Sequence, residues 1–149
     1  MSAAREPATI LVVDDNGDSR EIAALLLERA GYRVRRAESG AECLHIVESE
    51  PVDLVLLDVM MPGMDGFAVC AALRAGGRRL PVILLTARDD TDTRLESMNH
   101  GVSEFLTKPI NRHELFARVR AQLHILELAR QLDEVEDGLR RSAEPPARP

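Results

Sequence analysis

Five short apolar runs alternate along the chain with five longer stretches in which apolar residues recur every three or four positions. This alternation is typical of α/β folds. The first, third and fourth runs are apolar throughout, which requires helices on both faces of a parallel sheet. The second run alternates polar and apolar residues and is expected at a sheet edge. The expected strands are residues 9–14, 32–37, 53–58, 81–86 and 104–107.

Capping residues mark the expected helix boundaries. Asn16 or Asp18 can cap the first helix, which Gly31 would end. Right-handed crossovers between parallel strands then give a doubly wound sheet with helices on both faces. The other helices are expected to begin at the capping box Ser39-Gly40-Ala41-Glu42, at Asp65, at Asp90 or Thr91 with an end at Gly101, and at Asn111 with Glu114.

The fifth amphipathic stretch predicts an extended C-terminal helix. The pattern divides the chain into a domain over 8–125, a helical extension or linker over 126–140, and a disordered, proline-containing tail over 141–149. Along the extension, apolar residues recur at alternating steps of three and four positions, which gives a heptad seam of about two repeats. The seam suits either a parallel homodimer or the frayed end of an amphipathic helix. Its residues are Ile125, Leu128, Leu132, Val135 and Leu139.

Length and charge narrow the function classes. The 149 residues suit one domain with a substantial core. A net charge of −6 argues against direct nucleic-acid binding, because the phosphate backbone would repel the chain. The absence of a long apolar stretch and of a signal-peptide pattern predicts a cytoplasmic protein with no membrane contact. Cys43 and Cys70 are expected as reduced packing residues, and four histidines as exposed side chains: His45, His100, His113 and His124.

Four of the apolar runs end on residues that carry chemistry. They lead into Asp14-Asp15, Asp58, Thr86 and Lys108, and Lys108 is the only lysine among nineteen basic residues. Because parallel strands present their carboxyl ends at one edge of a sheet, these side chains are expected to converge there. Three carboxylates, a hydroxyl and an ammonium indicate a divalent metal and a phosphoryl group.

Together these motifs resemble the receiver domain of bacterial two-component response regulators, over roughly residues 8–125. The matching segments are Asp14-Asp15, residues 56–66 (LLDVMMPGMDG), Thr86-Ala87 and Lys108-Pro109. The resemblance implies a flavodoxin-like strand order of 2-1-3-4-5. It also implies a phosphoacceptor signalling switch that catalyses its own phosphorylation and dephosphorylation and is not an enzyme in the ordinary sense. The implied partners are a sensor histidine kinase or phosphotransfer protein, and a downstream protein or output domain controlled by the surface of the fourth helix, fifth strand and fifth helix.

The resemblance assigns a role to each site residue. Asp58 is the implied phosphoacceptor. Asp14, Asp15, Asp58 and the backbone carbonyl of Met60 are the implied ligands of Mg²⁺, with Mn²⁺ as the alternative, and hard oxygen ligands suit both ions. The remaining roles are phosphate binding and switching for Thr86, Lys108 and Phe105, a cis peptide bond before Pro109, modulation of dephosphorylation by Met60 and Arg88, and turn formation by Pro62 and Gly66.

Two other functions are compatible with this pattern. A phosphohydrolase with an aspartyl-phosphate intermediate needs an Asp-x-Asp arrangement and a cap insertion, whereas this chain has adjacent Asp14-Asp15 and no room for a cap. A receiver-like scaffold without phosphorylation is the second alternative, and the complete set of site residues argues against it. The sequence leaves open whether the chain acts alone or as the receiver part of a longer protein.

Overall fold

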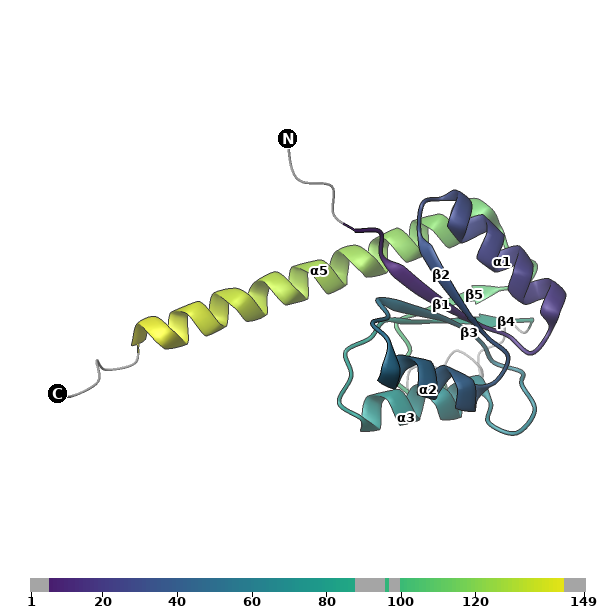
Figure 1. Ribbon diagram of the computed structural model, residues 1–149, viewed down its shortest axis with the longest axis horizontal. Coiled ribbons are helices and arrows are strands. Elements are labelled where there is room, and N and C mark those ends of the chain that lie inside the picture. The colour runs from purple at the N-terminus through teal and green to yellow at the C-terminus, as the bar shows by residue number, and fades with distance from the viewer. Residues whose placement is uncertain (1–5, 88–95, 97–99, 144–149) are drawn as a thin grey trace.

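A parallel five-stranded sheet forms the centre of the protein (Figure 1). The computed structural model describes residues 6–87, 96 and 100–143. The strand order β2-β1-β3-β4-β5 confirms the predicted order, and all four strand pairs are parallel. The strands are β1 (Thr9–Val13), β2 (Arg33–Ala37), β3 (Leu54–Asp58), β4 (Val82–Thr86) and β5 (Glu104–Thr107).

Helices cover both faces of this sheet. Figure 1 shows α1 and α5 on one face and α2 and α3 on the other. Alternate residues of a strand point to opposite faces, so Leu54 and Leu56 of β3 pack in the α1/α5 core while Val55 and Leu57 pack in the α2/α3 core. The fourth helix expected from Asp90 or Thr91 lies outside the described residues. The described helices are α1 (Gly17–Arg29), α2 (Gly40–Ser49), α3 (Gly66–Ala75) and α5 (Arg112–Ala143).

Side-chain caps begin the helices near the predicted residues. Asn16, not Asp18, caps α1 and accepts a hydrogen bond from the Ser19 N–H at 2.9 Å. Ser39 caps α2, but the Glu42 carboxylate accepts from the Glu38 N–H instead of the Ser39 N–H, so the reciprocal bond is shifted by one residue. Asp65 caps α3 and Asn111 accepts from the first turn of α5, as predicted.

The helix α5 is continuous across residue 125, where the domain was predicted to end, and the domain division stays a prediction. Residues 141–143 are helical, although the sequence assigned them to the tail. The reason is that the first proline after α5 is Pro145, so nothing in these three residues stops a helix. Residues 144–149 lie outside the described part of the chain. Among the described helices, none is long and apolar enough to cross a membrane.

Arg74 of α3 connects two turns that precede strands. Its Nε and Nη2 donate to the Gly101 carbonyl at 3.0 and 2.8 Å, and its Nη1 donates to the Arg78 and Leu80 carbonyls at 3.0 and 2.6 Å. Gly101 has a φ of +73°, and a Cβ there would lie 3.1 Å from Arg74 Nε, so glycine permits both the turn and the close approach. Arg74 therefore helps fix where β4 and β5 begin, and both strands end at the functional edge.

We expect Arg74→Lys to lower the free energy of unfolding by about 1–3 kcal/mol, because an ammonium cannot bridge both turns as the planar guanidinium does. Urea unfolding measures the change. The matched control is Arg35→Lys, since Arg35 makes an exposed ion pair with Glu50, and such pairs contribute less than about 1 kcal/mol. Equal losses in the two variants would contradict the assigned role of Arg74.

Candidate functional site

Three carboxylates lie together at the carboxyl end of the sheet. Asp14 follows β1 and Asp58 ends β3, each one residue beyond the register pair Val13 and Leu57. One oxygen each from Asp14, Asp15 and Asp58 lies within 4.8 Å of the others. Asp14 and Asp58 are only 2% and 5% exposed, whereas Asp15 is exposed. The cluster is therefore buried on one side and open to solvent through Asp15.

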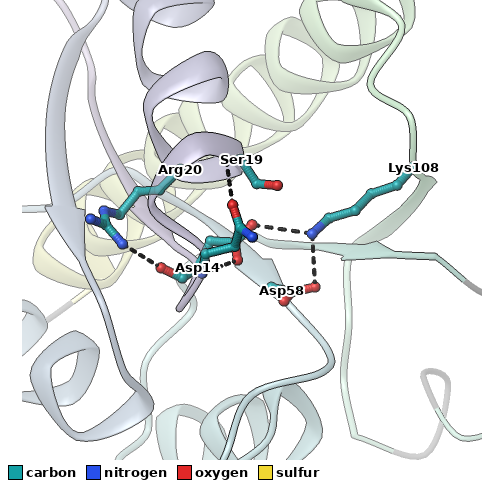
Figure 2. Close-up of polar contacts among 6 residues, drawn as sticks. Asp14, Ser19, Arg20, Asp58 and Lys108 are labelled. Atoms are coloured by element: carbon teal, nitrogen blue, oxygen red, sulfur yellow. Dashed lines mark hydrogen bonds and ion pairs between the residues drawn. The ribbon is translucent and has the colours of Figure 1, made fainter.

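Lys108 follows the edge strand β5, and its side chain extends toward this cluster, as Figure 2 shows. Its Nζ lies 3.2 Å from Asp14 Oδ2 and 3.4 Å from Asp58 Oδ1. The Lys108 N–H donates to the Thr86 carbonyl at 2.7 Å, which extends the pairing of β5 with β4. The following bond to Pro109 is cis, the isomer that the resemblance implied. A long, flexible lysine side chain can thus bring one positive charge to carboxylates on two other strands.

Asp14 is fixed at both its backbone and its side chain. Its Oδ1 accepts a hydrogen bond from the Asn16 N–H at 3.0 Å, and its carbonyl accepts from Arg20 Nη1 at 2.9 Å. Figure 2 shows Arg20 and Lys108 on opposite sides of Asp14. The sequence analysis did not identify Arg20. Its position in the first turns of the helix that follows Asp14 was the available signal, because that turn lies at the same edge of the sheet.

The position of Asp58 depends on a close backbone contact with the start of α3. The Val59 N–H donates to the Leu85 carbonyl at 3.1 Å, and the Gly66 N–H donates to the Val59 carbonyl at 3.0 Å. A Cβ on Gly66 would lie 2.6 Å from the Asp58 carbonyl oxygen and 2.9 Å from Val59 Cα. Only glycine therefore lets α3 begin so close to Asp58, which gives a physical reason for the turn role expected of Gly66.

Thr86 and Phe105 lie on the same face of the sheet. In the register of β4 with β5, Leu84 pairs with Phe105 and Thr86 pairs with Thr107. Alternate residues of a strand share a face, so Thr86 and Phe105 both belong to the face covered by α2 and α3. Thr86 is fully buried, and Phe105 is partly buried against the core on that side. Thr86 also lies one residue beyond Leu85, the register partner of Asp58.

The other candidate residues have simpler surroundings. Met60 is 59% exposed next to the cluster, and Arg88 lies outside the described residues. Cys43 and Cys70 are free and buried as expected, and burial raises the pKa of the Cys43 thiol to about 12. His100 differs from the expectation of an exposed ring, because it is half-buried and packs 5.4 Å from the Phe67 ring. The other three histidines, His45, His113 and His124, are exposed.

The electrostatics of the cluster favour a bound cation. Burial, followed by repulsion from Asp14, raises the pKa of Asp58 to about 6 even though Lys108 opposes the change. One ammonium cannot balance three carboxylates, and like charges this close disfavour ionisation. A divalent cation with a preference for hard oxygen ligands, such as Mg²⁺ or Mn²⁺, fits this donor set and would relieve the repulsion. The residues present therefore suit a metal site.

We expect Asp58→Asn to raise the free energy of unfolding of the metal-free protein at pH 8. The folded-state pKa of Asp58, about 6, lies above its unfolded value of 3.8, so the ionised carboxylate opposes folding as pH rises through this interval. Removing it should add about 1–3 kcal/mol at pH 8 and less at pH 5, where folded Asp58 is largely protonated.

Urea unfolding in the presence of a chelator measures this difference. Glu48→Gln removes an exposed carboxylate from α2 and serves as the control, which should change little at either pH. A parent protein more stable than Asp58→Asn at pH 8 would show that Lys108 compensates the buried charge fully.

Comparisons with known proteins agree with this geometry. Residues 10–120 match the family model described as the response regulator receiver domain. Similar relatives include the response regulator MprA of Mycolicibacterium vanbaalenii, which is 44% identical over 117 residues, covering 78% of this chain and 51% of the relative. The protein of the same name from Mycobacterium ulcerans is 42% identical over 130 residues, covering 87% and 55%. The chain thus spans about half the length of the curated relatives it matches.

Solved structures give the same result. A putative response regulator from Chloroflexus aurantiacus is 36% identical, with a TM-score of 0.74, and the match covers 79% of this chain and 98% of that chain. A CheY-like receiver domain protein from Methanospirillum hungatei is 26% identical, with a TM-score of 0.78 and coverage of 83% and 98%. Since the family model matches well over half of the sequence, this chain belongs to the response regulator receiver domain family.

Proposed function

We propose that this chain is a phosphoacceptor signalling switch in which Asp58 receives a phosphoryl group. The observation that carries the proposal is the contact of Asp58 with Lys108 inside the carboxylate cluster. Asp14 is held at both of its carboxylate oxygens, by the Asn16 N–H and by Lys108. Among the described residues, the side-chain contact of Asp58 is the ion pair of its Oδ1 with Lys108. Asp58 is therefore better placed than Asp14 to act as a nucleophile.

The proposed reaction is transfer from the phosphohistidine of a sensor histidine kinase or phosphotransfer protein. A carboxylate oxygen of Asp58 attacks phosphorus, the P–O bond forms, and the P–N bond breaks as the imidazole leaves. When bound, Mg²⁺ or Mn²⁺ would supply positive charge next to the phosphoryl oxygens, with Asp14, Asp15, Asp58 and the Met60 carbonyl as the proposed ligands. Lys108 would pair with another phosphoryl oxygen, since its Nζ already lies 3.4 Å from Asp58.

Hydrolysis returns the switch to its starting state, so the protein catalyses its own phosphorylation and dephosphorylation without turning over a separate substrate. Met60 is apolar and 59% exposed beside the cluster, and it offers no strong hydrogen bond to orient an attacking water. Arg88, from its position in the sequence, is proposed to influence the same step. We therefore expect a long-lived phosphoryl group.

The proposed binding surface for the kinase or phosphotransfer protein includes residues of α1. Ile22 and Leu25 are exposed apolar residues, at 55% and 47%. Ile22 and Ser19 line a hollow of about 310 Å³ with Lys108, Pro109 and Ile110, directly beside the site. A kinase or phosphotransfer helix seated on these residues could present its phosphohistidine to Asp58. The proposal includes a cytoplasmic location, where kinases draw phosphoryl groups from ATP.

The conformational change that we propose to follow phosphorylation begins at Thr86. Its hydroxyl would turn to a phosphoryl oxygen on Asp58, and the space it leaves would let Phe105 rotate inward. The support is that both residues share one face of the sheet and lie two register positions apart on paired strands. The surface of the fourth helix, β5 and α5 would then change and control a downstream protein or output domain.

With Mg²⁺ and acetyl phosphate, we expect the protein to gain one phosphoryl group, measured by intact mass. Asp58→Asn should gain none, because the amide is a poor nucleophile of nearly the same shape. Asp65→Asn is the matched control, since Asp65 lies in the same loop outside the carboxylate cluster, and it should be labelled like the parent. Equal labelling of Asp58→Asn would refute the acceptor, and no labelling of a metal-binding parent would favour the scaffold function.

Beryllofluoride, a phosphoryl mimic, should shift the backbone amide signals of Thr86, Ala87 and residues 100–110 in a ¹⁵N-resolved NMR spectrum. The reason is that movement of Thr86 and Phe105 changes β5 and the turn that follows it. Thr86→Val, which keeps the shape and removes the hydroxyl, should leave the distant signals unshifted while those of residues 14–15 and 58–60 still respond. A parent response limited to these last residues would show that the site operates without the proposed switch.

A further inference from the structure

The extension of α5 contacts the domain through one of its sides. Arg130 Nη2 lies 3.3 Å from Asp53 Oδ1, and Arg79 Nη1 lies 2.9 Å from Asp133 Oδ2. Leu126 and Ala129 line a hollow of about 460 Å³ between these two ion pairs. Asp53 precedes β3 and Arg79 precedes β4, so the extension is held at the amino-terminal edge of the sheet. The carboxylate site lies at the opposite edge.

Another side of the extension presents a continuous apolar surface to solvent. The seam residues Ile125, Leu128, Leu132, Val135 and Leu139 are 46–65% exposed. Among the described residues, nine large hydrophobic side chains are exposed, and five of them belong to this seam. Figure 1 shows the last turns of α5 projecting away from the sheet. A concentrated apolar surface of this kind marks an interaction site more strongly than scattered exposed residues do.

The seam is complementary to itself. Ile125, Leu132 and Leu139 occupy a positions of the heptad, and Leu128 and Val135 occupy d positions. Every charged residue of the extension falls outside the a and d positions. In a parallel pair the flanking g and e′ positions bring His124 opposite Ala129 and Gln131 opposite Glu136, so no like charges meet.

The contacts that hold the extension to its own domain do not compete with this seam. Arg130 and Asp133 fall at the f and b positions, which lie outside the a/d interface of a two-stranded coil. A second helix can therefore cover the seam while both ion pairs stay in place. A helix that covers the seam must supply a matching apolar repeat, and this chain itself carries one.

We propose that a second copy of this chain binds along the seam in a parallel two-stranded coil. The pairing places two receiver domains side by side at the same end of the coil, with both carboxylate sites left open. Gly138 at a g position weakens the last turn, so the interface is strongest from Ile125 to Val135. The proposal rests on the extension alone and does not depend on phosphorylation of Asp58.

A cysteine placed in the seam tests the parallel arrangement. Val135→Cys brings two thiols together at one d layer, and mild oxidation of the full chain should give a disulfide-linked dimer on a non-reducing gel. Glu134→Cys is the control, one residue away on the outer side of the helix, and should stay mostly unlinked. The native Cys43 and Cys70 are buried and do not interfere. Equal linking of both variants, or of neither, would overturn the parallel coil.

Sedimentation of the unmodified chain should show a monomer–dimer equilibrium that moves with concentration. Leu132→Glu should weaken association at least tenfold, whereas Glu134→Lys should leave it within about twofold. Leu132 is 63% exposed, so its replacement should not unfold the domain, and circular dichroism checks this. Asp58→Asn should dimerise like the parent, which separates failure of this proposal from failure of the phosphoacceptor function. Monomers at every concentration would overturn it.

Discussion

The repulsion among the carboxylates of Asp14, Asp15 and Asp58 is the constraint on which the chemistry of this site depends. Two of these groups are almost fully buried, and burial together with Asp14 raises the pKa of Asp58. Lys108 supplies one compensating charge at 3.2 and 3.4 Å from Asp14 and Asp58. The remaining imbalance makes the site receptive to a divalent cation.

The fold holds this unfavourable cluster together because its members are fixed by backbone contacts. Asp14 and Asp58 extend adjacent parallel strands, so the sheet itself sets their separation. The Asn16 N–H and the Arg20 guanidinium hold Asp14, and the close approach of Gly66 holds the backbone of Asp58. The repulsion among the carboxylates destabilises the folded state by much less than burial of the two hydrophobic cores stabilises it. The domain therefore stays folded with the cluster in place. A site of this kind is preorganised for charge stabilisation.

Much of the fold was predictable because strand periodicity and helix caps are local signals. The five strands were placed within about one residue of their observed ends, and the edge position of β2 followed from the alternation in Tyr32-Arg33-Val34-Arg35-Arg36. The choice between Asn16 and Asp18 as the first cap was not predictable, since both residues are suitable and the backbone decides between them. The helical state of Arg141–Ala143 was missed because composition describes an average tendency and not the position of the first helix-breaking residue.

The residues of the candidate site were predictable from the sequence, whereas the residues that hold the surrounding backbone in place were less so. Strand ends converge at one edge by topology, so Asp14, Asp15, Asp58, Thr86 and Lys108 could be grouped from the sequence. Arg20 offered only its position in the helix after Asp14 as a signal, and Arg74 offered none, because an arginine that binds backbone carbonyls resembles any other surface arginine in a sequence with eighteen of them. Their roles depend on turns that only the three-dimensional structure brings within reach. Contacts of a side chain with carbonyl groups in turns leave no periodic signal in the sequence.

The central claim is that the three carboxylates form one cation site whose occupancy relieves their repulsion. The most direct test is the free energy of urea unfolding measured over a Mg²⁺ titration, in the parent and in Asp14→Asn. Binding to the folded state alone should raise stability with RT ln(1 + [Mg²⁺]/Kd), which is about 2.7 kcal/mol at one hundred times Kd. We expect this increase in the parent at pH 8 and its near-complete loss in Asp14→Asn. Unfolding free energies that do not depend on Mg²⁺ in the parent would contradict the account.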